Sequence, residues 1–390
     1  MRPACPIRPI RPSPAACARQ FSIISAKGVP HLQKKLRLAV VGLGKMGLSH
    51  FSIANAHPRT DVVVCDASGF MLDGIAKYSG RPAYKDFDEM LAKEQIDAMI
   101  VATPSRLHAP MVRKALEKGI HVFCEKPFCL DWRESEALTA LAAEKGLISQ
   151  VGYHYRYVGA FQEMKRLVEA GAIGQITHVL AEAYGPVVLR PKGTTWRTDR
   201  AEGGGCLYDY AAHPINLLNW YFGEASGASG TLLNSIFSAD TDDEVYSTLL
   251  WESGLSAHVS VNWSDESYRK MSTKITMTGT NGRLYADRQE CQLYLREAVP
   301  GLSGYNKGWN VRYTTELTEE VGFYLRGEEY SAQIDAFVAA ILDGGSTVND
   351  FASATATDKT IALMLADRDA APTRSRATPM VARKKSWFGR

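Results

Sequence analysis

The sequence predicts two domains of different fold class: an α/β domain with a doubly wound parallel sheet, and an α+β domain with a mainly antiparallel, open sheet. Its 390 residues suit two domains, since one domain usually holds about 100–200 residues. From Leu36 onward, short apolar runs alternate with helical patterns, as in parallel α/β folds. Around residues 257–263, single apolar residues alternate with polar ones, which is typical of an antiparallel sheet with one solvent-facing side.

The first domain is expected over residues 36–153. Short apolar runs predict buried strands at 38–41, 61–66, 98–102 and 121–124. Helical patterns are found from Gly42 to about His57, over 105–118 up to Gly119, and from Asp131 to Gly146. Glu134 follows Asp131 by three residues, which is the spacing of a capping box at a helix start. Strands and helices therefore alternate, as crossover connections in a parallel sheet require.

The second domain is expected over residues 154–370. Apolar residues at every second position from 257 to 263 predict a half-buried strand. Asn281–Gly282 is a two-residue hairpin signal between strand candidates near 275–277 and 284–286. Apolar residues at 334, 337, 338, 341 and 342 form one helix stripe, which Gly344 ends. Strands gathered after an α/β unit favour a separate α+β domain.

The net positive charge of the chain comes from its two ends, because the segment between them is acidic overall. Residues 1–37 and 372–390 hold 14 of the 45 Lys and Arg and no acid, which leaves 31 basic and 42 acidic residues between them, a net charge of −11. We expect solvated tails at 1–35 and 371–390, because these segments are also rich in Pro, Ser and Ala. Because the basic residues in excess lie in these tails, nucleic acid is not an expected partner. No apolar run approaches the roughly 18–20 residues of a membrane helix, so a membrane is not an expected partner either.

Cysteine usage and the N-terminal segment bear on location. The seven cysteines are an odd number without paired spacing, which predicts a reducing, cytoplasmic location rather than a disulfide scaffold. Cys124 and Cys129 lack a second Cys or His pair of zinc-ligand spacing, so no metal is expected. Residues 1–30 are Arg-rich and acid-free like a targeting segment, but their prolines would break a transit helix. We interpret them as an extension or an upstream start.

The first chemical signal is the run Gly42-Leu43-Gly44-Lys45-Met46-Gly47, which follows a strand and precedes a helix. In a dinucleotide site Gly42 makes the tight turn, Gly44 lets the backbone approach a pyrophosphate, and Gly47 lets the helix pack on the strand. Asp66 follows Gly47 by 19 residues, at the end of the next strand, where its carboxylate would accept both adenosine ribose hydroxyls. Its charge would repel a 2′-phosphate, so we expect NAD rather than NADP.

Two further signals carry candidate catalytic groups. Glu125-Lys126-Pro127 stands at the carboxyl end of a predicted strand, where Lys126 could hold a substrate hydroxyl or be only a surface cation. Asp209 and His213 follow a glycine run at helical i, i+4 spacing, and such a pair is suited to acid/base work or to a surface salt link. Pro214 predicts either a kinked segment or a helix that begins near His213.

Several other side chains are weaker candidates. His108, after Thr103 and Pro104 at a helix start, could reach a bound cofactor, or it could be structural. Polar residues after a further strand candidate and before the glycine run could meet a ligand, or simply pack or pair within the protein; these are Tyr153, His154, Arg156, Trp196 and Arg197.

Together these motifs resemble the Gfo/Idh/MocA superfamily, named for glucose–fructose oxidoreductase, inositol dehydrogenase and a rhizopine-catabolism protein. The matching stretches lie in the family's order at 40–47, 102–108, 125–127, 150–157 and 204–213, and the resemblance covers about residues 36–370. It implies an N-terminal Rossmann domain, an α+β domain whose open sheet forms a homodimer or homotetramer, and NAD(P)-dependent oxidation of a sugar, polyol or nucleotide-sugar. The family's catalytic lysine, acid/base histidine and substrate-binding aspartate map to Lys126, His213 and Asp209.

The resemblance also implies sites for both ligands. The cofactor would lie against Gly42, Gly44, Lys45, Met46, Gly47, Asp66, Thr103, Pro104, His108, Glu125 and Lys126. The substrate would meet Lys126, Tyr153, Arg156, Trp196, Arg197, Asp209 and His213. Two alternatives stay open: an NAD-dependent glycosidase of the same superfamily, and a non-catalytic sugar-sensing regulator.

Overall fold

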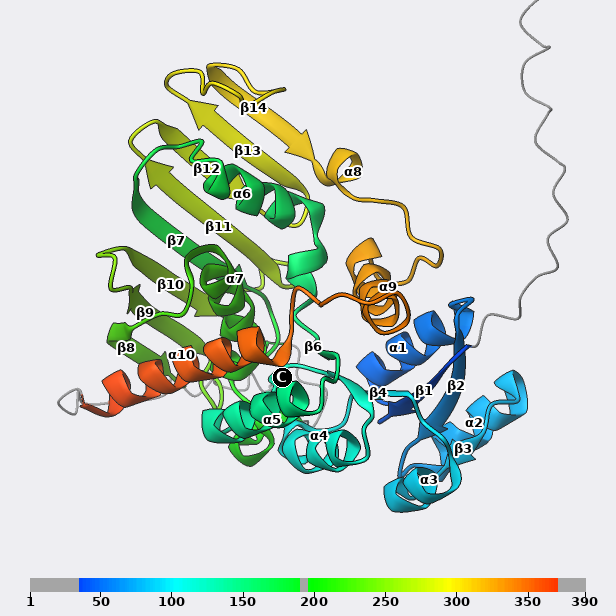
Figure 1. Cartoon of the computed structure of the whole chain (residues 1–390). Helices are drawn as coiled ribbons and strands as arrows, with labels where there is room; N and C mark the ends of the chain where they lie inside the picture. Colours follow the sequence, from blue (N-terminus) through cyan, green and yellow to red (C-terminus); the bar gives the residue numbers. More distant parts are fainter. Residues whose placement is uncertain (1–34, 190–195, 371–390) are drawn as a thin grey trace, which may run out of the picture. The chain divides into compact units, whose positions relative to one another are not determined.

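The computed structural model describes residues 35–189 and 196–370, which fold around two β-sheets (Figure 1). The two sheets are of the two predicted classes, one parallel and one mainly antiparallel. The tails expected at 1–35 and 371–390 lie outside the described residues, Lys35 apart. No helix within the described ranges has both the length and the apolar character that a membrane span requires.

The first sheet is parallel, and its six strands follow the order β3-β2-β1-β4-β5-β6. They are β1 (Leu36–Val41), β2 (Thr60–Cys65), β3 (Ala83–Tyr84), β4 (Ala98–Val101), β5 (His121–Cys124) and β6 (Ser149–Val151). The central strands are almost wholly buried, which is why their sequences are nearly unbroken apolar runs. Strand order reverses between β1 and β4, and the carboxyl ends at such a point form the ligand-binding crevice of open α/β sheets.

Five helices connect these strands: α1 (Lys45–Ala56), α2 (Gly69–Ser79), α3 (Phe87–Lys93), α4 (His108–Glu117) and α5 (Trp132–Glu144). Asp131 caps α5, since its carboxylate accepts the Arg133 N–H at 3.0 Å, but among the described residues the Glu134 side chain does not bond back to Asp131, so the predicted capping box is only half present. A later helix, α9 (Glu328–Leu342), packs beside α1. Phe337 of α9 meets Phe123 of β5 with ring centres 6.0 Å apart, so this distant segment completes the core of the first domain.

The second sheet has eight strands in the order β14-β13-β12-β11-β7-β10-β9-β8. They are β7 (Ile176–Tyr184), β8 (Gly227–Asn234), β9 (Glu244–Leu250), β10 (Ser256–Asn262), β11 (Ser272–Gly279), β12 (Gly282–Ala286), β13 (Glu290–Leu295) and β14 (Gly308–Tyr313). Every neighbouring pair is antiparallel except β7 and β10, which run parallel.

Within residues 35–189 and 196–370, helices cover one face of the second sheet and leave the other open (Figure 1). The covering helices are α6 (Gly159–Glu169), α7 (Ala212–Phe222) and α10 (Phe351–Ala370), and a short helix α8 (Thr314–Leu317) follows β14. Helix α10 also packs against α5, where the Ser135 hydroxyl donates to the buried Asp358 carboxylate at 2.6 Å. The apolar core therefore continues from the first domain into the second.

Two local predictions are corrected by the structure. The turn between β11 and β12 consists of Thr280 and Asn281, because Gly279 pairs with Gly282. Gly282 belongs to β12, where it pairs with Leu295 of β13, and only glycine fits there because a Cβ would lie 1.9 Å from the Tyr294 carbonyl oxygen. The helix expected over 105–118 starts as a 3-10 turn at Ser105–Leu107, and its α-helical part begins only at His108.

Candidate active site

The glycine loop after β1 has the close contacts that its motif predicts. Gly42 has φ +89°, and a Cβ there would lie 2.7 Å from the Ala102 carbonyl oxygen. A Cβ on Gly47 would lie 1.7 Å from the Gly42 carbonyl oxygen, so helix α1 can approach β1 only because this residue is glycine. A Cβ on Gly44, in contrast, would meet nothing within 4 Å. Packing therefore requires Gly42 and Gly47, whereas Gly44 leaves open space at the start of α1.

That open space has the electrostatics of an anion site. Helix α1 has neither a side-chain cap nor an acidic residue in its first turn, so its N-terminus can face a negatively charged group. The Asp66 carboxylate lies beside the loop, where it accepts the N–H of Leu43 at 2.5 Å and that of Ser68 at 2.7 Å. The residues present thus fit a dinucleotide, with its pyrophosphate at Gly44 and a ribose near Asp66.

Lys126 and Asp209 come together although they are far apart in the sequence. The Lys126 ammonium donates to the Asp209 carboxylate at 2.6 Å and to the Asp209 carbonyl oxygen at 2.9 Å. Arg197 donates to the other carboxylate oxygen at 2.7 Å. Burial by itself would raise the pKa of Asp209, but the charges of Lys126 and Arg197 outweigh it and hold the pKa below its usual value. Asp209 is therefore an ionised anchor that holds two cations in the site.

The loop that carries Trp196 and Arg197 is tied to the glycine run. Gly205 N–H donates to the Arg197 carbonyl oxygen at 3.1 Å, and a Cβ on Gly204 would lie about 2.5 Å from that same oxygen. The Arg197 guanidinium also lies over the Trp196 ring, 4.6 Å from its centre. The glycines thus allow this loop to close over the helix start, which brings Arg197 to Asp209.

The segment between Asp209 and His213 is helical but widened. Residues Leu207–Ala211 form a π turn and the α-helix α7 begins at Ala212, so each expected alternative holds in part: the segment is irregular, and its α-helical part begins next to His213. Pro214 has no N–H for the Tyr210 carbonyl in an α register or for the Asp209 carbonyl in a π register. The Asp209 carbonyl accepts from Lys126 instead. The helix irregularity therefore contributes an acceptor to the site.

His213 lies in a buried cluster of aromatic rings. The ring centres of His154 and Tyr155 are 5.0 and 5.1 Å from that of His213, and that of Tyr153 is 6.1 Å away. Burial lowers the pKa of His213 well below its usual value, and the nearby Lys126 charge adds to this effect. The imidazole is thus neutral at ordinary pH, and Nδ1 has no hydrogen-bond partner among the described residues. A neutral ring can take up a proton.

The Glu125 carboxylate is closely packed on two sides, against His50 and against the backbone of Gly152. The His50 ring of α1 contacts its carboxylate at 2.6 Å, and a Cβ on Gly152 would lie 2.8 Å from the same carboxylate. Burial opposes ionisation of Glu125, but the contact with His50 and the Lys126 charge outweigh it and lower its pKa. Sequence reasoning missed His50, whose position three residues after Gly47 carries no local signal. Within the described ranges, no three His, Cys, Asp or Glu side chains are arranged to hold a metal ion.

His108 and Arg156 are engaged by the protein itself. The two ring nitrogens of His108 contact the carbonyl oxygens of Pro127 at 2.8 Å and Thr103 at 3.0 Å, which ties together the loops after β5 and β4. Arg156 donates to the Asn216 side chain at 2.8 Å and to the Val348 carbonyl at 2.7 Å. Both are buried, and these contacts favour the structural interpretation of each.

Tyr330 packs against the aromatic cluster around His213, and the sequence did not indicate it. Its ring stacks on His154 with centres 4.6 Å apart, and its hydroxyl lies 3.4 Å from His154 Nε2. Burial lowers the pKa of His154 to about 3, so this ring is neutral as well. Because α9 approaches from 176 residues further along the chain, only the tertiary fold reveals this neighbour.

Two family models match the chain. Residues 36–153 match an oxidoreductase family with an NAD-binding Rossmann fold, and residues 161–285 match the GFO/IDH/MocA C-terminal domain. These matches cover more than half of the chain, so the protein belongs to the Gfo/Idh/MocA family of oxidoreductases. Residues 36–153 are accordingly an NAD-binding Rossmann domain of this oxidoreductase family.

Several known proteins are similar over much of the chain. The putative UDP-kanosamine synthase oxidoreductase subunit of Amycolatopsis mediterranei is 29% identical over 337 residues, which is 80% of this chain and 89% of that protein. The scyllo-inositol 2-dehydrogenase (NAD(+)) of Bacillus subtilis is 30% identical over 218 residues, 54% of this chain but only 62% of that enzyme. Levoglucosan dehydrogenase with NADH and levoglucosan has a TM-score of 0.77 at 23% identity, over 86% of this chain and 98% of that one. At this identity, the last similarity shows a shared fold alone.

Proposed function

We propose that the protein transfers a hydride between a secondary alcohol of a sugar, polyol or nucleotide-sugar and the nicotinamide of NAD. The observation that carries this proposal is the buried contact of Lys126 with Asp209 at 2.6 Å, next to the neutral His213. The similarity to a scyllo-inositol 2-dehydrogenase supports the substrate class.

Each residue has a definite role in this proposal. Lys126, fixed by Asp209, donates a hydrogen bond to the reacting hydroxyl oxygen and stabilises the negative charge that develops there. The hydroxyl proton passes to His213, whose ring is neutral and therefore has an unprotonated nitrogen available to accept it. Arg197 and Asp209 bind neighbouring hydroxyls, and Tyr153 lies against the His213 ring. Bound NAD would supply the hydride-accepting nicotinamide for the carbon that carries the alcohol.

The cofactor preference is part of the same proposal. The Asp66 carboxylate beside the glycine loop would accept the adenosine ribose hydroxyls and repel the phosphate of NADP. Gly44 and the start of α1 would hold the pyrophosphate. NAD is therefore expected to be bound in preference to NADP.

The test is turnover of the full chain with NAD and a panel of inositols, neutral sugars, amino sugars and glycosides, followed by NADH absorbance. We expect Lys126→Ala to reduce kcat/KM by about a thousandfold, because one preorganised donor to a developing oxyanion is worth about that much. Lys93→Ala is the matched control, since that lysine pairs with Glu89 on the surface.

Three outcomes would contradict the proposal. Unchanged turnover in Lys126→Ala would exclude its role. Release of free sugar from a glycoside without net NADH would favour the glycosidase. Dinucleotide binding with no turnover of any compound would favour the sensor.

We also propose that the open face of the second sheet joins copies of the chain. Three aromatic residues are exposed on one face of β13 and β14: Tyr294 (37%), Trp309 (61%) and Tyr313 (53%). Tyr294 and Trp309 are register partners with ring centres 5.2 Å apart. Such a gathering of large rings on one side of a sheet is typical of a protein interface.

A further inference from the structure

His50 is a buried polar ring that has no role in the proposed reaction so far. It lies on α1, three residues after Gly47, and is wholly buried, with its ring centre 5.1 Å from that of Phe123. An apolar side chain would fit such surroundings at less cost, because a buried polar group needs a hydrogen-bond partner. The partner is Glu125, whose Oε1 lies 2.6 Å from His50 Nε2. The other ring nitrogen, Nδ1, has no partner within residues 35–189 and 196–370.

The contact with His50 favours the ionised form of Glu125. Burial by itself would raise the pKa of this carboxyl group, and the hydrogen bond from His50 is the largest effect that opposes burial, so that the pKa is lowered. Because an ionised carboxylate has no proton to donate, the proton of this hydrogen bond lies on His50 Nε2. Without the imidazole N–H, the buried carboxylate would lose its main support.

Groups from several elements face the Glu125 carboxylate. Besides His50 of α1 and the adjacent Lys126, they are Cys124 of β5, His108 of α4, His154 of the turn after β6 and Tyr330 of α9. Burial lowers the pKa of both of these other histidines and raises that of the thiol and the phenol. Apart from His50, Lys126 is therefore the charged group among them.

Glu125 acts on the proposed site in two ways. Its Oε2 accepts the backbone N–H of Lys126 at 3.2 Å, which fixes the chain from which this lysine reaches Asp209. Its charge also completes a balance in which Lys126 and Arg197 are positive and Asp209 is the other negative group, so the four charges sum to zero. With Glu125 protonated, passage of the hydroxyl proton to His213 would raise the net charge from +1 to +2, which a buried site disfavours.

We propose that His50 is a positioning residue for hydride transfer, which holds Glu125 as an ionised carboxylate beside Lys126. This inference rests on the proposed dehydrogenase function and adds to it a residue of α1, the helix whose start would hold the pyrophosphate. One buried contact thereby connects the cofactor helix to the proposed catalytic lysine. Because His50 acts through Glu125, its loss should slow the chemical step rather than weaken binding of the sugar.

The kinetic test compares His50→Leu, which removes the N–H, with His50→Gln, whose amide can place an N–H near the position of Nε2. The ratio of the His50→Leu kcat to the wild-type kcat should fall by about tenfold from about pH 8 to about pH 6, because a carboxyl group whose pKa lies one unit above the pH is only about a tenth ionised. KM for the sugar should be nearly unchanged. His50→Gln should restore most of the rate at the lower pH.

Infrared spectroscopy of the full chain without substrate is a second readout. At about pH 6, His50→Leu should show a carboxylic-acid C=O band in addition to those of the wild type, because burial then raises the pKa of Glu125 unopposed by His50. This band should be absent from His50→Gln and from the double variant His50→Leu/Glu125→Gln. Asp358, whose pKa is raised to about 7, is present in every variant and cancels in the difference spectra.

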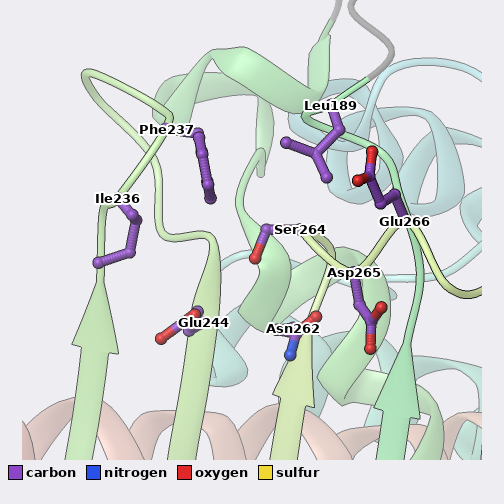
Figure 2. Close-up of a pocket in the computed structure, with 8 residues that line it drawn as sticks. All are labelled: Leu189, Ile236, Phe237, Glu244, Asn262, Ser264, Asp265 and Glu266. Carbon is purple, nitrogen blue, oxygen red and sulfur yellow. The ribbon is translucent and has the colours of Figure 1, made fainter. Parts of the chain in front are cut away.

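Two matched controls lie outside the proposed site. His57→Leu removes another imidazole, at the end of α1, whose Nε2 lies 3.6 Å from the Asp335 carboxylate of α9. Glu244→Gln is the control for the change at Glu125, since Glu244 is a partly buried carboxylate in a separate hollow where β8 and β10 end and β9 begins (Figure 2). In both controls the kcat ratio to wild type should not change with pH.

A kcat ratio of His50→Leu that is constant with pH would overturn the inference, and so would the absence of the additional infrared band. Equal losses of rate in His50→Leu and His50→Gln at every pH would mean that His50 serves packing alone, which also overturns it. Failure of the proposed function is distinguishable. If no sugar yields NADH with the wild type, the dehydrogenase proposal fails, while the infrared spectra still decide whether His50 keeps Glu125 ionised.

Discussion

Among single residues, Asp358 is a buried acid outside the proposed chemistry. One of its oxygens accepts from Ser135 and Cys129, and the other is buried with no partner among the described residues. Burial raises the pKa of Asp358 to about 7, against an ordinary value near 3.8. The folded chain thus keeps a proton on this group that the unfolded chain has already released.

Asp358 should make the protein less stable as the pH rises. Between about pH 4 and about pH 7 the folded state binds more protons than the unfolded state, so the free energy of unfolding falls with pH, by at most about 4 kcal/mol from this group. Asp358→Asn should flatten this slope, as urea unfolding at several pH values would show. Parallel pH profiles for variant and wild type would contradict the prediction.

Asp66 is the residue expected to decide between the two dinucleotides. Asp66→Asn keeps an oxygen for the Leu43 N–H but removes the charge that would repel a phosphate. The ratio of kcat/KM for NADP to that for NAD should rise by about tenfold or more. Steady-state kinetics with both cofactors measure this ratio. An unchanged ratio would mean that other residues set the preference.

At the scale of elements, two glycines of the loop between β1 and α1 are expected to have different roles, Gly47 in packing and Gly44 in cofactor binding. Gly47→Ala should destabilise the fold severely, because its Cβ would lie 1.7 Å from the Gly42 carbonyl oxygen. Gly44→Ala has open space around its Cβ and should fold normally, yet bind NAD at least about tenfold more weakly by obstructing the pyrophosphate. Thermal unfolding and NAD calorimetry test the two effects separately. NAD affinity unchanged in Gly44→Ala would place the pyrophosphate elsewhere.

The π turn before α7 shows why element boundaries resist sequence reasoning. The i, i+4 spacing of Asp209 and His213 favoured a regular helix, and Pro214 argued against one. The structure has a helix throughout but widens it over Leu207–Ala211. Pro214 has no N–H to donate to the Asp209 carbonyl oxygen. The cost of that missing hydrogen bond depends on whether another donor lies near, and here the donor is Lys126, which is 83 residues away in the sequence.

At the scale of the whole molecule, the proposed oligomer face is directly testable. Trp309→Arg, which places a charge among exposed aromatic side chains, should shift the sedimentation of the protein to a smaller species. Tyr324→Arg is the control, because Tyr324 is 64% exposed but lies outside the sheet. A wild-type protein that sediments as a monomer would contradict the proposed oligomer.

Much of the fold could be predicted because its signals are local. Buried parallel strands give apolar runs. Helix α9 gives an apolar stripe at 334, 337, 338, 341 and 342, of which the first three are buried and the last two partly buried. The site was predicted only as separate pieces. Lys126, Asp209 and Arg197 meet through contacts that cross 83 and 12 residues, which no local spacing encodes.

By itself, the sequence determined the two fold classes, the dinucleotide loop and the identity of the reactive groups, because apolar periodicity and glycine geometry act between near neighbours. Only the tertiary structure decided which of these groups face one another. It joined Lys126 to Asp209, engaged His108 and Arg156 in structural contacts, and placed Tyr330 beside His154. The physical reason is that burial and charge pairing depend on every element around a side chain, whereas periodicity depends only on its own.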